Sequence, residues 1–122
     1  MGKRDYRLRS PEDFRRALRS RPVVRSGPVA IYKIDLDECC RIGFVLPKKL
    51  VRSAVQRNQI KRWSRVSFRD LLKNIPEQLI ISRPFGLVVR IMHPLQKQWS
   101  PVVLASEVRQ PLVAAFSQLR SK

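Results

Sequence analysis

The stretch RIGFVLPKKLVRSAVQRNQIKRWSRVSFR, residues 41–69, places a strand pattern directly before a helix pattern. Arg41 to Leu46 is an apolar run typical of a strand, and Pro47-Lys48-Lys49 ends it. Ser53 is a favourable N-cap for a helix over about 54–73. The stretch therefore predicts a helix that follows a sheet strand after a short basic connection.

The same stretch is strongly basic, with nine Lys or Arg residues and no Asp or Glu. On the predicted helix, four cations recur every fourth residue and form a ladder along one face: Arg57, Lys61, Arg65 and Arg69. Like charges at this spacing destabilise a helix by roughly a few tenths of a kcal/mol per pair, and bound phosphates would relieve the repulsion. A basic face that meets only solvent is the alternative, and the missing acids argue against it.

The whole chain of 122 residues carries 26 Lys and Arg against 9 Asp and Glu, a formal net charge of +17. Such an imbalance favours a polyanionic partner, either nucleic acid or an anionic membrane. The chain has no apolar run of about 18 residues, and Met1 to Arg9 lacks the apolar region of a signal peptide. Tyr6 also stands where a myristoylation signal needs Ser or Thr. We therefore expect a cytoplasmic nucleic-acid-binding protein with no membrane association.

The remaining patterns predict two more helices and three more strands. The helices are expected at 11–19 and within 104–120, and the strands at 21–25, 29–34 and 87–92. Pro111 suits the last helix only in its first turn or at a kink. A polar turn over 35–40 should join 29–34 to 41–46 as an antiparallel hairpin. The order αβββαβα predicts one α+β domain over residues 1–122, with helices packed on a mainly antiparallel sheet.

The sequence offers no group of residues suited to catalysis or to metal binding. Cys39 and Cys40 are adjacent, so on an extended chain they point to opposite faces, and His93 is the single histidine. The acids that could bind Mg²⁺ are scattered over turns and a helix start: Asp5, Asp13, Asp35, Asp37 and Glu38. We therefore predict no catalytic residue and no metal site on the protein itself.

A longer motif appears when the basic stretch is read as a whole. Its elements are Lys48-Lys49, Ala54-Val55, Arg57-Asn58, Lys61-Arg62, Arg65 and Phe68-Arg69. This run resembles the signature of the bacterial ribonuclease P proteins, a KK pair followed by A-V-x-R-N-R-x-K-R and R-x-x-F-R. Further positions extend the resemblance over nearly the whole chain: Leu8, Phe14, Tyr32 and the strands at 41–45 and 87–89. The departures are Gln59 for the second Arg of the R-N-R triplet, Val66 for a frequent acid, Leu46-Pro47 before the lysines, and a longer segment from Ile75 to Gly86.

The resemblance implies an α+β fold of the ribosomal protein S5 domain 2-like type. It implies the protein subunit of an endoribonuclease that removes the 5′ leader from precursor tRNA, with the catalytic centre and its Mg²⁺ ions in the RNA subunit. The protein alone would bind no cofactor. Its partners would be the catalytic RNA and precursor tRNA, with no obligate protein partner.

The resemblance also assigns two sets of site residues. The RNA-binding set is Lys48, Lys49, Arg52, Arg57, Asn58, Lys61, Arg62, Arg65 and Arg69. The leader-binding set, expected in a cleft between the first helix and the sheet, is Arg7, Phe14, Leu18, Tyr32 and Phe44. Aromatic faces stack on unpaired bases with little regard to sequence, which suits an enzyme that accepts many leaders. Phe14 and Phe44 could instead be ordinary core residues.

Three other functions are compatible with composition alone. A ribosomal or other structured-RNA-binding protein would share the charge but not the motif at 57–69. A DNA-binding regulator would need a helix-turn-helix pair, whereas the basic helix here follows a strand. A self-sufficient nuclease would need catalytic residues that the sequence does not supply.

Overall fold

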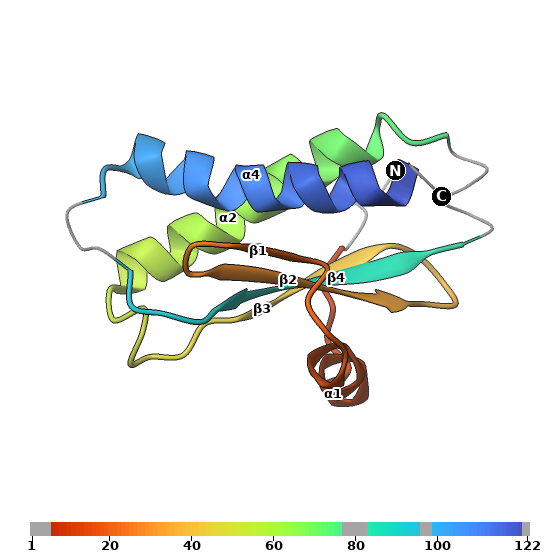
Figure 1. Ribbon diagram of the computed structural model, residues 1–122, viewed down its shortest axis with the longest axis horizontal. Helices are drawn as coiled ribbons and strands as arrows, with labels where there is room; N and C mark the ends of the chain where they lie inside the picture. Colours follow the sequence, from red (N-terminus) through yellow and green to blue (C-terminus); the bar gives the residue numbers. More distant parts are fainter. Residues whose placement is uncertain (1–5, 77–82, 96–98, 121–122) are drawn as a thin grey trace.

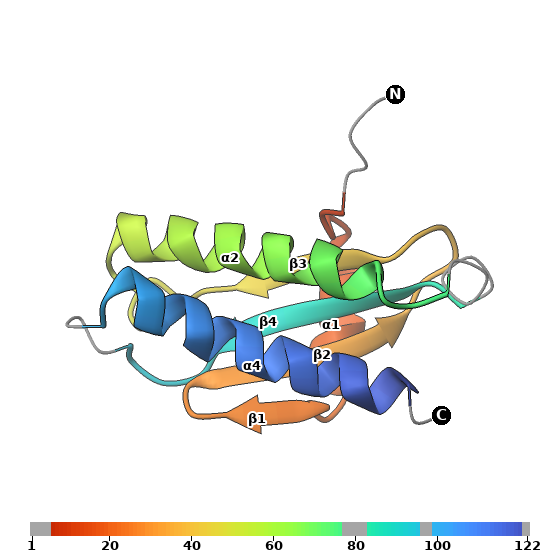
Figure 2. The ribbon, with the colours of Figure 1, turned by 90° about the horizontal axis from the view of Figure 1, so that it is seen from above.

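A four-stranded sheet separates one helix from two others in the computed structural model, which describes residues 6–76, 83–95 and 99–120 (Figures 1 and 2). The strands are β1 (Val24–Ser26), β2 (Val29–Asp35), β3 (Arg41–Val45) and β4 (Phe85–Ile91), in the spatial order β1-β2-β4-β3. Helix α1 (Pro11–Arg19) covers one face, and α2 (Ala54–Leu72) lies beside α4 (Pro101–Arg120) on the other. The predicted α+β class and the order αβββαβα are confirmed.

The predicted hairpin between β2 and β3 is wrong, because β4 lies between them. β4 pairs antiparallel with β2 and parallel with β3, so that Val88 faces both Tyr32 and Gly43. β4 is nearly all apolar and buried, as a central strand covered on both faces should be. The observed hairpin is β1–β2, where Gly27 adopts a φ of 56°, a conformation that glycine tolerates at little cost.

Alternate side chains of the strands enter two separate hydrophobic clusters. The larger cluster lies under α2 and α4 and contains Phe68, Phe85 and Phe116, whose ring centroids are 5.7–6.2 Å apart in edge-to-face contacts. The smaller cluster lies under α1 and includes Ala17, Tyr32 and Val88. The sheet therefore has no solvent-facing side along most of its length, and each face carries its own helical cover.

Each helix begins at a capping serine. Ser10, Ser53 and Ser100 accept backbone N–H bonds through Oγ from the residue three positions later, at 3.5, 3.2 and 3.3 Å. The predicted bounds of α1 match the structure, and α2 ends one residue earlier than predicted. α4 begins at Pro101, three residues before its predicted range, so Pro111 lies inside the helix on its buried side rather than in the first turn.

Two sequence features fall partly outside the described residues. Positions 77–82 belong to the segment 75–86 that looked longer than usual, and positions 96–98 belong to the connection between β4 and α4. None of the helices described is long and apolar enough to cross a membrane.

Gly43 on β3 sets how closely α1 approaches the sheet. A Cβ atom placed on Gly43 would lie 2.6 Å from Cζ of Phe14, which is too close unless the ring moves, and 3.1 Å from Cβ of Leu8, which is a tight contact. We therefore expect Gly43→Ala to lower the free energy of unfolding by about 1–3 kcal/mol, as overpacking usually does. Urea denaturation followed by circular dichroism would measure this.

A second substitution shows whether the contact with Phe14 is the cause. Adding Phe14→Leu to Gly43→Ala should recover part of the loss, because the smaller side chain leaves room for the new methyl group. If the two substitutions are simply additive, the ring of Phe14 does not limit the approach of α1.

Candidate RNA-binding site

The basic ladder turns gradually from the sheet toward solvent along α2. Each step of four residues advances about 40° around a helix with 3.6 residues per turn, so the four cations do not share one exposed strip. Arg57, Lys61 and Arg65 are half-buried, whereas Arg69 is exposed. The ladder therefore begins close to the body of the protein and ends on its outer surface.

Arg65 lies over the ring of Phe44, with its guanidinium carbon 5.6 Å from the ring centroid. Phe44 projects from β3 toward α2 and packs against the larger hydrophobic cluster. This contact holds the guanidinium on the sheet side of the ladder, and a cation over an aromatic face is attracted by the ring. Arg65 therefore has two roles: it packs α2 against Phe44, and it contributes a positive charge to the ladder.

The other cations of the RNA-binding set surround the ladder. Five residues of the set are exposed on the connection from β3 to α2 or on α2 itself: Lys48, Lys49, Arg52, Asn58 and Arg62. The opposite side of α2 faces the core, where Ile60 and Leu71 are buried. Trp63 is only half-buried, and the centroid of its ring lies 5.7 Å from the guanidinium carbon of Arg62. The small side chains of Ser64 and Ser67 are also buried.

The structure brings together only part of the predicted leader-binding set. Phe14, Leu18 and Tyr32 meet in the smaller cluster under α1. The prediction that Phe44 lines the same cleft is wrong, because successive β3 side chains alternate and Gly43 takes the place facing α1. Arg7 is exposed beside Ile42 at the outer edge of β3, three strand spacings or roughly 14 Å from β2.

Tyr32 is more buried than a stacking platform would be, with 4% of its surface exposed. Its hydroxyl oxygen accepts a hydrogen bond from Nη1 of Arg90 at 3.4 Å. The half-buried Arg90 was missed at the sequence level, although it is the one charge in the apolar run 87–92. A small pocket of about 370 Å³ does lie beside α1, but it is lined by Leu8, Arg9, Ser10, Asp13 and Arg41, and by none of the predicted leader residues.

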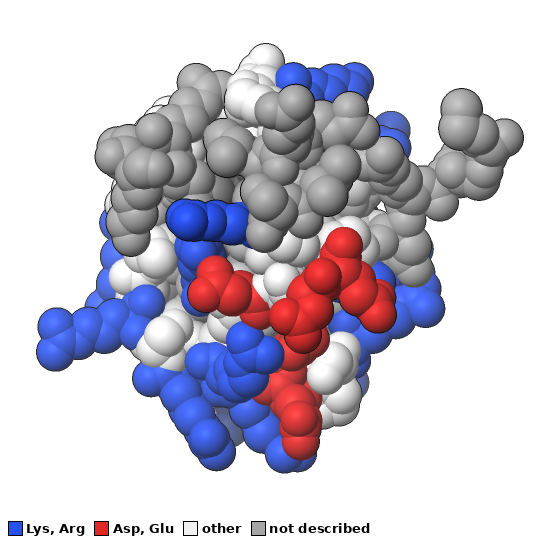
Figure 3. All heavy atoms as spheres, turned by 90° about the vertical axis from the view of Figure 1, so that its right-hand side faces the viewer, with Lys and Arg blue, Asp and Glu red and all other residues white. Residues whose placement is uncertain are grey.

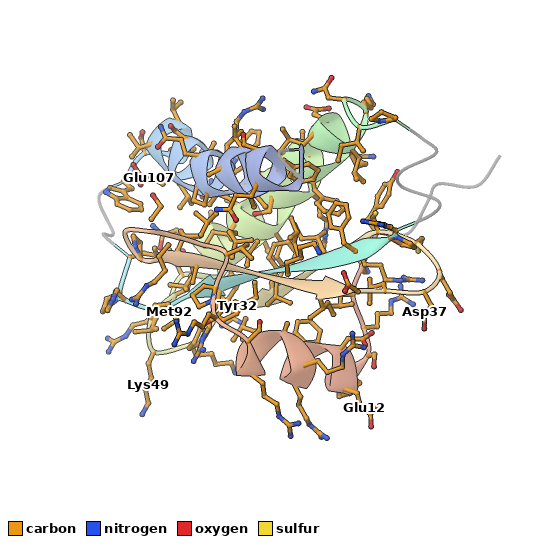
Figure 4. All side chains as sticks on the ribbon, turned by 45° about the vertical axis from the view of Figure 1, so that its right-hand side comes forward. Glu12, Tyr32, Asp37, Lys49, Met92 and Glu107 are labelled. Atoms are coloured by element: carbon orange, nitrogen blue, oxygen red, sulfur yellow. The ribbon has the colours of Figure 1, made fainter. Side chains whose placement is uncertain are left out.

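Several of the described acidic side chains lie together at one end of the molecule, seen in Figure 3 as a red patch. Five of them come from the start of α1 and the turn between β2 and β3: Glu12, Asp13, Asp35, Asp37 and Glu38. Three of these are paired with cations at 3.1–3.8 Å: Asp13 with Arg16, Asp35 with Lys33, and Glu38 with Arg41. Figure 4 shows Glu12 and Asp37 at this end and Lys49 at the other. Positive charge is therefore least balanced around α2 and its lead-in.

Cys40 offers little nucleophilic chemistry. Cys40 is buried, and this burial raises the pKa of its thiol above the usual value, against a smaller lowering by a backbone hydrogen bond involving Phe85. A thiol that stays protonated is a poor nucleophile. In the part of the chain that the structure describes, no three His, Cys, Asp or Glu side chains are grouped to hold a metal ion.

Comparison with known proteins agrees with the basic helix and its motif. The family model described as ribonuclease P matches residues 2–112. The chain belongs to the bacterial ribonuclease P protein family. The ribonuclease P protein component of Nitrosomonas europaea is 40% identical over 94 residues, covering 76% of this chain and 73% of that protein. The Lactobacillus helveticus component is 33% identical and covers 69% and 73%.

Solved structures agree on the fold. The ribonuclease P protein of Staphylococcus aureus superposes with a TM-score of 0.68 at 24% identity, covering 92% of this chain and 96% of that one. The Thermotoga maritima ribonuclease P protein gives 0.62 at 22% identity, with the same two coverages. As a ribonuclease P protein, the chain is a subunit of an endoribonuclease whose catalytic centre lies in its RNA. Membership sets aside the ribosomal protein, the DNA-binding regulator and the self-sufficient nuclease.

Proposed function

We propose that α2 and its lead-in bind the ribonuclease P RNA, and that the α1 side of the sheet binds the 5′ leader of precursor tRNA in the cytoplasm. The observation that carries the first half is the surface of residues 48–69, where exposed and half-buried cations follow one another with no acid among them. Such a surface gains affinity for phosphates by releasing their counterions. Asn58 adds a neutral amide that can donate to a phosphate or a base.

The leader-binding half rests on the residues at the border of the smaller cluster, on the α1 side of the sheet. Half-buried Phe14, Leu18 and Met92 border the smaller cluster there, and Arg90 lies among them beside Tyr32. Figure 4 shows Tyr32 and Met92 on this side of the sheet. Apolar and aromatic edges hold unpaired bases without selecting sequence, while an arginine follows the backbone. This surface is therefore suited to a single strand of variable sequence.

The excess positive charge should also help the ribonuclease P RNA and precursor tRNA to associate, a role that Mg²⁺ ions otherwise share. Two RNAs repel each other, and a protein with a net charge of +17 can offset part of that repulsion. The Mg²⁺ ions that perform the chemistry would be held by the RNA. The protein alone needs no cofactor for this role.

Removing cations from the ladder should weaken binding without unfolding the chain. Arg57→Ala and Lys61→Ala should each lower affinity for the ribonuclease P RNA and reduce the slope of log K against log salt by about one. Thermal stability should stay the same or rise, because repulsion along α2 falls. Filter binding at several salt concentrations would measure both the affinity and the slope.

A matched control is Arg109→Ala, which removes one exposed charge from α4 and should change the slope less. Arg65→Ala should differ from both, since it also removes the contact with Phe44 and lowers stability. If Arg57→Ala and Lys61→Ala bind as the wild type does, α2 does not contact the RNA.

The division of labour with RNA can be tested directly. We expect the purified protein with Mg²⁺ to leave precursor tRNA intact, and its addition to ribonuclease P RNA to lower the Mg²⁺ concentration needed for cleavage. Cleavage rates across a Mg²⁺ titration, with and without protein, give the result. Site-specific cleavage by RNA-free protein would contradict the proposal.

The leader surface predicts a difference between two substrates. Arg90→Ala in the holoenzyme should weaken binding of precursor tRNA and reduce its salt slope by about one, while binding of mature tRNA stays unchanged. Tyr32→Phe removes the oxygen that Arg90 contacts but keeps the cation and the ring, so it should bind both like the wild type. Equal losses for both substrates after Arg90→Ala would mean that Arg90 does not contact the leader.

A further inference from the structure

A pocket of about 730 Å³ opens where the first turns of α2 and α4 meet. Both helices begin at the same end of the molecule, on the left in Figures 1 and 2. The pocket is lined by the lead-in to α2, by three glutamine or valine positions of its first two turns, and by residues before and at the start of α4. Its volume lies within the range of roughly 300–1,000 Å³ that is usual for small-ligand sites.

The polar part of this pocket is suited to an anion. Lys49 and Arg52 line it, and no Asp or Glu is among its lining residues. The N-terminal turns of both helices point their positive dipole ends toward this region. Gln56 and Gln59 add amide groups that can both donate and accept hydrogen bonds.

The apolar part is suited to a flat ring. Half-buried Trp99 packs against the larger hydrophobic cluster and also lines the pocket, together with Leu95 and Pro101. Val55, another lining residue, is 65% exposed. On the next positions of α4, Val102 and Val103 are 79% and 41% exposed. Large apolar side chains are therefore exposed around a basic pocket. Exposed apolar side chains grouped in this way are typical of a binding site.

We propose that this pocket binds one unpaired nucleotide of the ribonuclease P RNA, an inference that rests on the proposed RNA-binding role of α2. The nucleobase stacks on Trp99, and its phosphate lies between Lys49 and Arg52. Unpaired bases turned out of a helix or loop are the usual targets of specific RNA recognition, and aromatic side chains receive them by stacking. Gln59, where the family signature has Arg, contributes an amide that can pair with a base edge.

The position of the pocket points to the RNA subunit rather than to the leader. Lys49 and Arg52 belong both to the pocket and to the basic surface that continues along α2. The leader surface lies on the other side of the sheet, under α1. One RNA can therefore cover α2 and fill the pocket without crossing the sheet.

Photo-crosslinking of the reconstituted holoenzyme with bound precursor tRNA tests the occupant. The chain has two tryptophans, Trp63 and Trp99, so a crosslinked peptide identifies the site. Short-wave ultraviolet irradiation followed by mass spectrometry should join the peptide containing Trp99 to an unpaired nucleotide of the ribonuclease P RNA. A crosslink from Trp99 to precursor tRNA, or none from Trp99, would overturn the inference.

Affinity measurements with ribonuclease P RNA test the contribution of the pocket. Trp99→Ala should weaken binding about 5- to 150-fold, the loss expected for one stacked base, while Trp99→Phe keeps most of the affinity. Because Trp99 also packs on the core, Gln59→Glu provides a second test that keeps the packing: a carboxylate cannot donate to the base edge and adds a negative charge to a pocket that binds an anion, so it should weaken binding about tenfold or more. Gln110→Glu on α4 makes the same change of charge away from the pocket and is its matched control.

The result separates this inference from the proposed function. If Trp99→Ala and Gln59→Glu bind as the wild type does while Arg57→Ala binds weakly, the pocket is empty and α2 still binds RNA. If Arg57→Ala also binds normally, the RNA-binding role of α2 fails together with the pocket.

Discussion

β4 is covered on both of its faces, and the rest of the structure depends on this burial. Leu87, Val88 and Val89 are fully buried although they point alternately to opposite sides of the sheet. A strand of this kind is stable only if each face of the sheet has its own cover. α1 supplies one cover, and α2 with α4 supplies the other. The two proposed RNA surfaces therefore lie on opposite sides of one sheet, each next to the helix that covers it.

The distribution of charge follows a second constraint, because a net charge of +17 must be accommodated in a chain of 122 residues. Acids are concentrated at the start of α1 and in the β2–β3 turn, where several pair with nearby cations. Exposed ion pairs of this type contribute little to stability, typically about 0–1 kcal/mol each. Their arrangement matters more for the field, since it leaves the surface around α2 unneutralised. RNA would be attracted most strongly to that side.

Local features were predicted from the sequence, whereas long-range pairing was not. Ser10 with Pro11, and Ser53 before an apolar period, define where α1 and α2 begin, because capping depends on residues close together in the chain. The hairpin between β2 and β3 was wrong because neighbouring strands in sequence often pair, and nothing local shows that β4 will enter between them. The start of α4 was placed three residues too late because the cap at Ser100 was overlooked.

The same distinction applies to the candidate site. The neighbours within the basic ladder could be predicted because residues four apart lie next to each other on a helix. The change from half-buried Arg65 to exposed Arg69 follows from the drift of about 40° per step. The leader set could not be placed residue by residue, since the face of Phe44 depends on the register of β3, and a shift of one position exchanges the two faces. The pocket beside Trp99 had no sequence signal, because it forms only where two helix starts, 54 and 101, meet in space.

Neighbouring residues of β3 connect the two surfaces. Phe44 lies under Arg65 on the α2 side, and Gly43 lies against Phe14 on the α1 side. β3 also pairs along its whole length with β4, so it cannot shift without disturbing the central strand. Packed interiors resist small displacements. A strand that is packed on both faces therefore keeps the elements on its two sides in a fixed position relative to each other. Under the proposed function, an RNA subunit bound to α2 would therefore fix the orientation of the α1 surface as well. The protein can then hold the leader at a defined place relative to the catalytic RNA without any catalytic group of its own.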